Sequence, residues 1–125
     1  MEKRRENGQT GRKGEDIACE LLVRKGHTIM YRNWRSGHLE IDIITLDRIG
    51  IHFVEVKTRR PPVQAAPQDC VNAVKQKRII KAAQAWTARH GDIEAESHFD
   101  IVSVVIDGTG TYTEYYPDAY IPAFL

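Results

Sequence analysis

His38-Leu-Glu-Ile-Asp-Ile-Ile-Thr-Leu-Asp-Arg-Ile-Gly-Ile-His-Phe-Val-Glu-Val-Lys-Thr-Arg-Arg60 is the stretch around which the fold is organised. It contains two short runs rich in Ile, Val and Phe, from Leu39 to Leu46 and from Ile51 to Val56. Between them stands Asp47-Arg48-Ile49-Gly50. This pattern is typical of two antiparallel strands joined by a tight turn, so we predict a β-hairpin.

The register of this hairpin follows if the turn is symmetric about residues 48 and 49. Asp42 then lies opposite Glu55, and Glu40 lies opposite Lys57. These four side chains share one face with Ile44, Leu46, Ile51 and Phe53, whereas the other face is lined by Ile41, Ile43, Val54 and Val56. Apolar residues on both faces are typical of a strand buried on two sides.

The two opposed carboxylates need an explanation, because like charges across a strand pair repel each other and a buried carboxylate is costly without compensation. A divalent cation such as Mg²⁺ between Asp42 and Glu55 provides one, since hard ions take oxygen ligands. The backbone carbonyl of Val56 is a natural further ligand, and Lys57 points to the same side, where it could hold a water or a phosphate oxygen. The alternative is a solvated face with a cross-strand ion pair.

Asp42 followed after twelve residues by Glu55-Val56-Lys57 resembles the PD-(D/E)xK signature of the restriction-endonuclease-like nucleases, with Ile41 in place of the frequent proline. More of the chain is similar to the YraN-like family of small bacterial proteins, although Leu39 stands where that family typically has Gly. The segments that carry this resemblance are Gly11-Arg-Lys-Gly-Glu15, Arg32-Asn33, Glu40-Ile-Asp42, Phe53-Val-Glu-Val-Lys-Thr-Arg59, Lys75-Gln76 and Phe99-Asp100.

The resemblance implies a restriction-endonuclease-like fold and a nuclease activity. It also implies that Glu15, from the first helix, completes the metal site, whereas the sequence alone leaves open that this carboxylate only favours the helix dipole. Related nucleases often act as dimers, so a homodimer is an expectation of the same kind.

The remaining segments predict an α/β domain with a mixed sheet flanked by helices, in the order αβββαββ. We expect Gly11 and Gly14 to let the first helix approach a neighbour closely, and the 98–107 strand to be central in the sheet. The expected segments are a mobile tail at 1–7, helices at 8–26 and 68–90, and strands at 28–34, 98–107 and 111–116, the last at an edge.

Basic residues lie near the predicted acidic site. Lys75 falls within the apolar stripe of the second helix, formed by Val71, Val74, Ile79, Ala82, Ala83, Ala85 and Trp86, so we predict that it points toward the acids or a phosphate. The candidate nucleic-acid contacts, each of which could equally be solvated, are Arg32, Arg35, Arg59, Arg60 and Arg78.

Composition sets wider limits. A length of 125 residues predicts one domain, and a net charge of +1 gives no bulk signal for nucleic-acid binding. No run is long and apolar enough for a membrane span, so we expect a cytoplasmic protein. We interpret Cys19 and Cys70 as incidental thiols in a reducing compartment. The five histidines lack the spacing of a zinc site. His52 should point away from Asp42, as a core or surface residue. We expect Asp100 to have a structural role.

Together these features predict hydrolysis of DNA phosphodiesters, with branched DNA among the candidate substrates, and with Mg²⁺ as cofactor and Mn²⁺ as a substitute. In this reading Asp42, Glu55, Lys57 and Glu15 are catalytic, and Glu40 and Lys75 support the site. One alternative is a nucleic-acid-binding protein that has the fold but no useful turnover. Another is a structural partner protein whose acids form only ion pairs.

Overall fold

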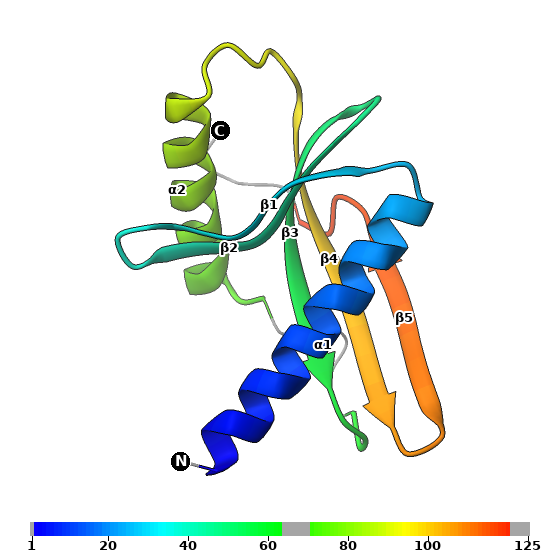
Figure 1. The fold of residues 1–125 in the computed structure, drawn as a ribbon. Helices are drawn as coiled ribbons and strands as arrows, with labels where there is room; N and C mark the ends of the chain where they lie inside the picture. The colour runs from blue at the N-terminus through cyan, green and yellow to red at the C-terminus, as the bar shows by residue number, and fades with distance from the viewer. Residues whose placement is uncertain (1, 64–70, 121–125) are drawn as a thin grey trace.

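The fold is an α/β domain in which one five-stranded mixed sheet carries a helix on each face (Figure 1). A computed structural model describes residues 2–63 and 71–120, with side chains from residue 11 onward. The predicted order αβββαββ is confirmed and is consistent with a restriction-endonuclease-like fold. The elements are α1 (Glu2–Arg24), β1 (Thr28–Ser36), β2 (Leu39–Asp47), β3 (Gly50–Arg59), α2 (Ala73–Arg89), β4 (Ser97–Asp107) and β5 (Gly110–Tyr116).

The hairpin of β2 and β3 forms as predicted near its turn and opens farther along. Pairing extends from the turn to Ile43 opposite Val54, in the predicted register. Beyond that point the described residues of β2 pair with β1 alone, and β2 departs from β3 in Figure 1. The prediction that the ladder continues through Asp42 opposite Glu55 to Glu40 opposite Lys57 is therefore wrong. Ile41 is also on the face opposite to the predicted one, because the diverging strand packs it into the core beneath α2.

The turn between these strands is held by the side chain of Asp47. Its Oδ1 accepts hydrogen bonds from the N–H groups of Ile49, at 3.0 Å, and Gly50, at 3.2 Å. Gly50 has a φ of 151°, and a Cβ atom there would lie 2.2 Å from the backbone oxygen of Glu96. Glycine is thus required by both the conformation and the space available.

The sheet order is β1-β2-β3-β4-β5, so the middle strand is β3. β4, which we expected to be central, is the fourth strand; it pairs in parallel with β3 and antiparallel with β5. The parallel pairing requires the chain to cross over the sheet between β3 and β4, and α2 forms that crossover. The edge position predicted for residues 111–116 is confirmed in β5.

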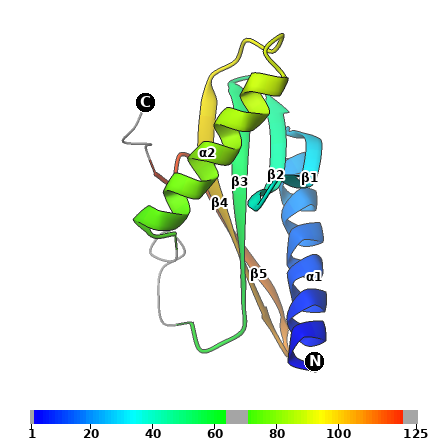
Figure 2. The ribbon, with the colours of Figure 1, turned by 90° about the vertical axis from the view of Figure 1, so that its left-hand side faces the viewer.

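Each face of the sheet has its own apolar core, because the two helices lie on opposite sides of it (Figure 2). Beneath α2, Trp86 is fully buried and contacts Phe53 edge to face, with ring centroids 5.8 Å apart. Beneath α1, Ala18 and Leu22 pack on β3 and β4. The sheet is therefore covered on both sides, as the doubly apolar strands predict.

Both helices differ in detail from the sequence-based prediction. α1 begins at Glu2, earlier than the expected Gly8. α2 begins at Ala73, where the side chain of Asn72 caps it by accepting the N–H of Lys75; residues 64–70 of the predicted helix and loop lie outside the described residues. In the apolar stripe of α2, Val74 is exposed and Ile80 is buried in its place.

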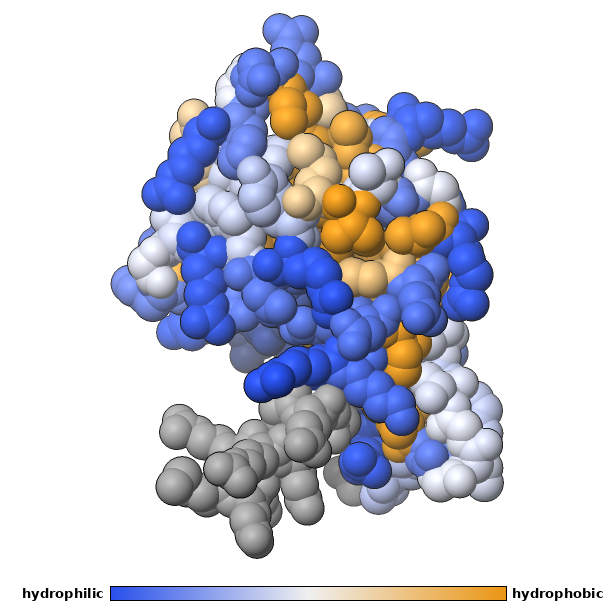
Figure 3. All heavy atoms as spheres, viewed as in Figure 1, coloured by the Kyte–Doolittle hydropathy of each residue, from blue (hydrophilic) through white to orange (hydrophobic). Residues whose placement is uncertain are grey.

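The surface on the α1 side is mostly hydrophilic, with separate hydrophobic patches (Figure 3). In the described part of the chain, neither helix combines the length and apolar character needed to cross a lipid bilayer.

Candidate functional site: an acidic pocket where two strands separate

A cavity of about 300 Å³ opens where β2 departs from β3. Four elements contribute to it, namely α1, β2, β3 and the start of α2. The cavity brings together all the residues predicted to be catalytic or metal-binding, and its lining consists of Gly11, Glu15, Asp42, Glu55, Val56, Lys57, Thr58 and Lys75.

Asp42 is held in the opening by the backbone of β3. Its Oδ2 accepts a hydrogen bond of 2.9 Å from the N–H of Val56, replacing a strand-to-strand bond at the point where the ladder stops. Burial, and next the negative charge of Glu55, raises the pKa of Asp42 to about 8. The two acids are therefore close enough to oppose each other's ionisation.

Glu55 is 8 % exposed and faces two ammonium groups. Its Oε1 lies 2.5 Å from Nζ of Lys75 and 3.7 Å from Nζ of Lys57. Burial acts to lower the pKa of Lys75, but its hydrogen bonds and the negative charges of Glu55 and Asp42 together outweigh burial, so the pKa is raised. Lys75 thus points at the acids from the first turn of α2, as the sequence predicted.

Glu15 reaches the pocket because α1 packs tightly on β3. A Cβ atom on Gly14 would lie 1.8 Å from Oγ1 of Thr58, so glycine permits this contact, whereas a Cβ on Gly11 would meet no described atom within 4 Å. The expected close approach therefore holds for Gly14 and is wrong for Gly11. Oε2 of Glu15 accepts a hydrogen bond of 3.0 Å from the Asn33 side chain, which turns the carboxylate partly toward β1.

The donor set suits a hard divalent cation. The carboxylates of Asp42 and Glu55 supply oxygens from two strands, and Glu15 borders the same cavity. A strand residue presents its N–H and C=O to the same side, and the N–H of Val56 faces Asp42, so its carbonyl belongs to this side as well. Oxygen ligands of this kind, beside lysines that can contact phosphate, fit Mg²⁺ or Mn²⁺.

Three predicted residues are engaged elsewhere. Glu40 does not oppose Lys57; it pairs with Arg35 on β1, with 3.6 Å between the charged groups, because β2 has left β3 at this point. Arg32 binds Asp16 at 2.7 Å and lies 3.8 Å from Glu15.

The other predicted phosphate contacts lie outside the lining of the pocket. Arg59 donates to the hydroxyl of Ser103 at 3.3 Å. Arg60 is exposed just beyond β3, and Arg78 is exposed on α2.

A second groove, of about 560 Å³, shares Lys75 with the acidic pocket. It runs between the β1–β2 turn and the start of α2, and its lining consists of His38, Leu39, Glu40, Asn72, Val74, Lys75, Arg78 and Ile79. The sequence did not indicate this groove, because it depends on how far β2 diverges from β3.

Sequence reasoning also missed a buried polar network at the other end of β3. His52 is 1 % exposed, so of the two positions left open, core and surface, it has the core one. The structural role expected for Asp100 fits the hydrogen bonds it accepts from Tyr115 and the backbone of Asp118. His27 belongs to the same network. Most of its hydrogen bonds join residues that are far apart in sequence, so spacing alone does not reveal the network.

Comparison with known proteins agrees with the sequence motifs. Residues 14–104, a range that includes every acid and lysine of the pocket, match the sequence model of the "Uncharacterised protein family UPF0102". A UPF0102 protein of Nitratidesulfovibrio vulgaris is 43% identical over 111 residues, which cover 89% of this chain and 83% of that protein. One from Trichlorobacter lovleyi is 40% identical over 120 residues, covering 94% of each. One from Geobacter metallireducens is 38% identical over 118 residues, covering 94% of this chain and 97% of its own.

Proposed function

The chain belongs to the UPF0102 family, the YraN-like family that its motifs resemble, and from its acidic pocket we propose that it is a metal-dependent nuclease that hydrolyses phosphodiester bonds of DNA. The observation that carries this proposal is the meeting of Asp42 and Glu55, from two separating strands, with Lys57 and Lys75 in one open cavity. A buried ion pair alone would need only one acid and one base.

Asp42, Glu55 and the carbonyl of Val56 would hold Mg²⁺, with Mn²⁺ as a substitute. When bound, the cation polarises a phosphate oxygen and lowers the pKa of a coordinated water. Burial and the charge of Glu55 raise the pKa of Asp42, and a cation held between the two carboxylates would offset both effects.

The lysines act on the reacting groups. Lys57 orients the attacking water or stabilises the charge that develops on the phosphate, and Lys75 contacts a phosphate oxygen from α2. Water adds to phosphorus, one P–O bond breaks, and the leaving oxygen takes up a proton. Glu15 accepts a hydrogen bond from Asn33 at the rim and supports the metal site from α1.

The groove next to the pocket provides a path for the nucleic acid. Arg78 lines it, Arg60 lies beyond the end of β3, and both are exposed cations that suit a phosphate backbone. Branched DNA is a candidate substrate, because separated strands could follow the groove and the pocket. A homodimer would place one pocket on each of the two DNA strands.

One observation favours a second function. Lys75 already lies 2.5 Å from Glu55, so this carboxylate is compensated without a metal ion. A protein that kept these contacts permanently would bind nucleic acid through the same basic groups and would not cut it.

Cleavage assays separate the two functions. We would incubate the protein with single-stranded, duplex, flapped and four-way branched DNA, with Mg²⁺ or Mn²⁺, and compare it with Asp42→Asn and Lys57→Ala. Asparagine keeps an acceptor for the N–H of Val56 while removing the charge, so Asp42→Asn tests the ligand and leaves the strand contact in place. Glu20→Gln, an exposed position on α1, is the matched control.

We expect at least one DNA to be cut only when metal is present, with a loss of about 100-fold or more in both pocket variants and no loss in the control. Binding without cleavage by the unmodified protein would establish the second function. Neither binding nor cleavage of any substrate would reject both functions.

A further inference from the structure

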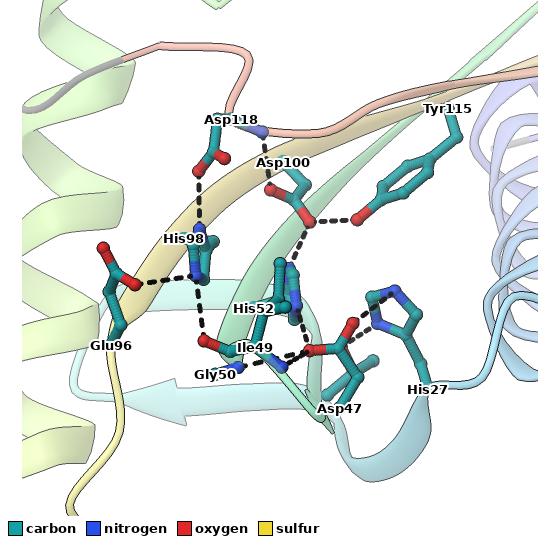
Figure 4. A network of polar contacts seen from close by, with 11 residues as sticks. His27, Asp47, Ile49, Gly50, His52, Glu96, His98, Asp100, Tyr115 and Asp118 are labelled. Carbon is teal, nitrogen blue, oxygen red and sulfur yellow. Dashed lines mark hydrogen bonds and ion pairs between the residues drawn. The ribbon is translucent and has the colours of Figure 1, made fainter.

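We propose that His27, Asp47 and His52 form a second, structural metal site for an ion of the zinc class, separate from the acidic pocket. The three residues come from the connection after α1, the end of β2 and the buried part of β3. Their ligand atoms all lie within 4.8 Å of one another, and Figure 4 shows both rings facing the carboxylate.

Both imidazoles direct the same nitrogen at Asp47. Nε2 of His52 lies 2.8 Å from Oδ1, and Nε2 of His27 lies 3.5 Å from Oδ2. Their ring centroids are 4.4 Å apart. Two nitrogens and the carboxylate of Asp47 therefore surround one small space, which an ion that accepts nitrogen and oxygen ligands can occupy.

The other nitrogen of each ring is occupied by a partner behind it. Nδ1 of His52 lies 2.6 Å from Oδ2 of Asp100, and Nδ1 of His27 lies 2.6 Å from Oγ1 of Thr45. A metal-binding histidine typically donates its second N–H to a carboxylate or similar group, which fixes the tautomer and leaves the first nitrogen free to coordinate. With Nδ1 bonded to Asp100, His52 presents the Nε2 lone pair to the proposed ion.

This outer partner is itself held rigidly. Asp100 is fully buried and accepts hydrogen bonds from the hydroxyl of Tyr115 and from the N–H of Asp118, the latter at 2.9 Å. His98 stacks on His52 with 4.9 Å between ring centroids, but its Nδ1 lies 2.8 Å from Asp118 and its Nε2 lies 3.4 Å from the carbonyl oxygen of Ile49, not at Asp47. His98 is thus a neighbour of the site and not a ligand.

The distances suit a tetrahedral ion. Zinc bonds of about 2.0–2.1 Å to nitrogen and oxygen place neighbouring ligand atoms about 3.3 Å apart. The observed separations, 2.8 Å to Oδ1 of Asp47 and 3.5 Å to its Oδ2, lie on either side of that value. Two imidazoles and one carboxylate favour a borderline ion such as Zn²⁺ over Mg²⁺, which prefers oxygen ligands only. Water would complete the coordination, because the Asp47 side chain is 14% exposed.

An ion bound at this site would link the α1–β1 connection to the hairpin turn. Through the bond between His52 and Asp100 it would also link both segments to β4. It does not depend on the proposed nuclease function. The acidic pocket, with its all-oxygen ligand set, is expected to prefer Mg²⁺ or Mn²⁺, so the two sites can be distinguished by metal.

Metal binding to the purified chain tests the proposal. After removal of metals with a chelator, Co²⁺ would be titrated while the visible absorption of tetrahedral cobalt is recorded, and Zn²⁺ binding would be measured by calorimetry. The ligand variants are His27→Gln and Asp47→Asn. The matched control is His38→Gln, an exposed histidine outside the network, and Asp42→Asn controls for the acidic pocket.

We expect one tetrahedral Co²⁺ per chain, displaced by Zn²⁺, with affinity at least about tenfold weaker in both ligand variants and unchanged in both controls. Nitrogen NMR of the unmodified protein avoids any effect of the substitutions on folding, and Zn²⁺ should shift the Nε2 signals of His27 and His52. The absence of tetrahedral binding, an unchanged affinity in His27→Gln, or a loss of binding in Asp42→Asn would overturn the proposal. If no tetrahedral binding is found, the three side chains are held together by hydrogen bonds alone.

Discussion

At the scale of single residues, the pocket makes ionisation of Asp42 unfavourable. Burial and the charge of Glu55 raise its pKa to about 8 in the metal-free chain. The native state therefore holds a proton that the unfolded state releases at a much lower pH. It follows that this group makes the free energy of unfolding fall as pH rises from about 4 to about 8, and that a cation bound there replaces the proton.

The affinity of the pocket for Mn²⁺ should thus depend on pH. Below about pH 8 the cation must displace the proton on Asp42, so affinity should rise by up to about tenfold per pH unit and level off above that value. Calorimetry between about pH 6 and about pH 9, in buffers of different ionisation enthalpy, measures both the affinity and the proton released. The Asp42→Asn chain should lose this binding, and a flat profile in the unmodified protein would contradict the role given to Asp42.

The residues of the pocket were predictable because their chemistry is unusual where they stand. Acids within apolar strands singled out Asp42 and Glu55, and an inward lysine singled out Lys75. The same pattern placed Glu40 and Ile41 wrongly, since alternation assumes that a strand keeps its partner, and β2 does not.

At the scale of elements, the contact between α1 and β3 positions Glu15. Gly14→Ala should lower stability by about 1–3 kcal/mol, because the new methyl group overlaps Thr58 and the helix must move away from the strand. Gly11→Ala is the matched control on the same helix; it meets no described atom within 4 Å and should raise stability by up to about 1 kcal/mol through helix propensity.

Urea unfolding of the two variants measures this difference. Nuclease activity should fall in Gly14→Ala, as Glu15 moves with the helix. If both substitutions stabilised the chain equally, the tight packing of α1 on β3 would be refuted.

Element types were easier to predict than element ends. The β2–β3 turn is determined by two of its own residues, Asp47 and Gly50, so it could be predicted from the sequence. The start of α2 depends on the Asn72 cap, which has to be chosen among several polar residues. The burial of Ile80 in place of Val74 depends on how the helix lies on the sheet, which the sequence does not give.

At the scale of the whole molecule, charge gives little guidance to function, since the net charge is +1. DNA binding by the proposed nuclease must therefore arise from local cations and should be sensitive to salt. In the Asp42→Asn background, Arg60→Ala and Arg78→Ala should each reduce the slope of log affinity against log salt by about one.

Fluorescence anisotropy over a range of salt concentrations measures these slopes. Arg48→Ala, an exposed arginine at the hairpin turn, should leave the slope unchanged. Equal slopes in all the chains would mean that the DNA binds elsewhere.

The α/β class and the order of elements could be predicted from local patterns, because each segment has a clear period. The order of strands in the sheet could not. β4 is more apolar than β3, yet β3 is in the middle, because the crossover through α2 places β4 beyond it. The histidine network was hidden for the same reason, as only the folded sheet brings His27, His52 and Asp100 together.

The parallel pairing of β3 with β4 has a consequence for synthesis on the ribosome. β3 gains its first neighbour, β2, as soon as it emerges, but its second neighbour follows only after all of α2 has been translated. Throughout that interval the nascent chain presents an unpaired, apolar strand, the kind of edge that other growing chains can join. The fraction of newly made chains that fold without aggregating therefore depends on how soon β4 is translated, and chaperones that shield this edge should increase the yield of folded protein.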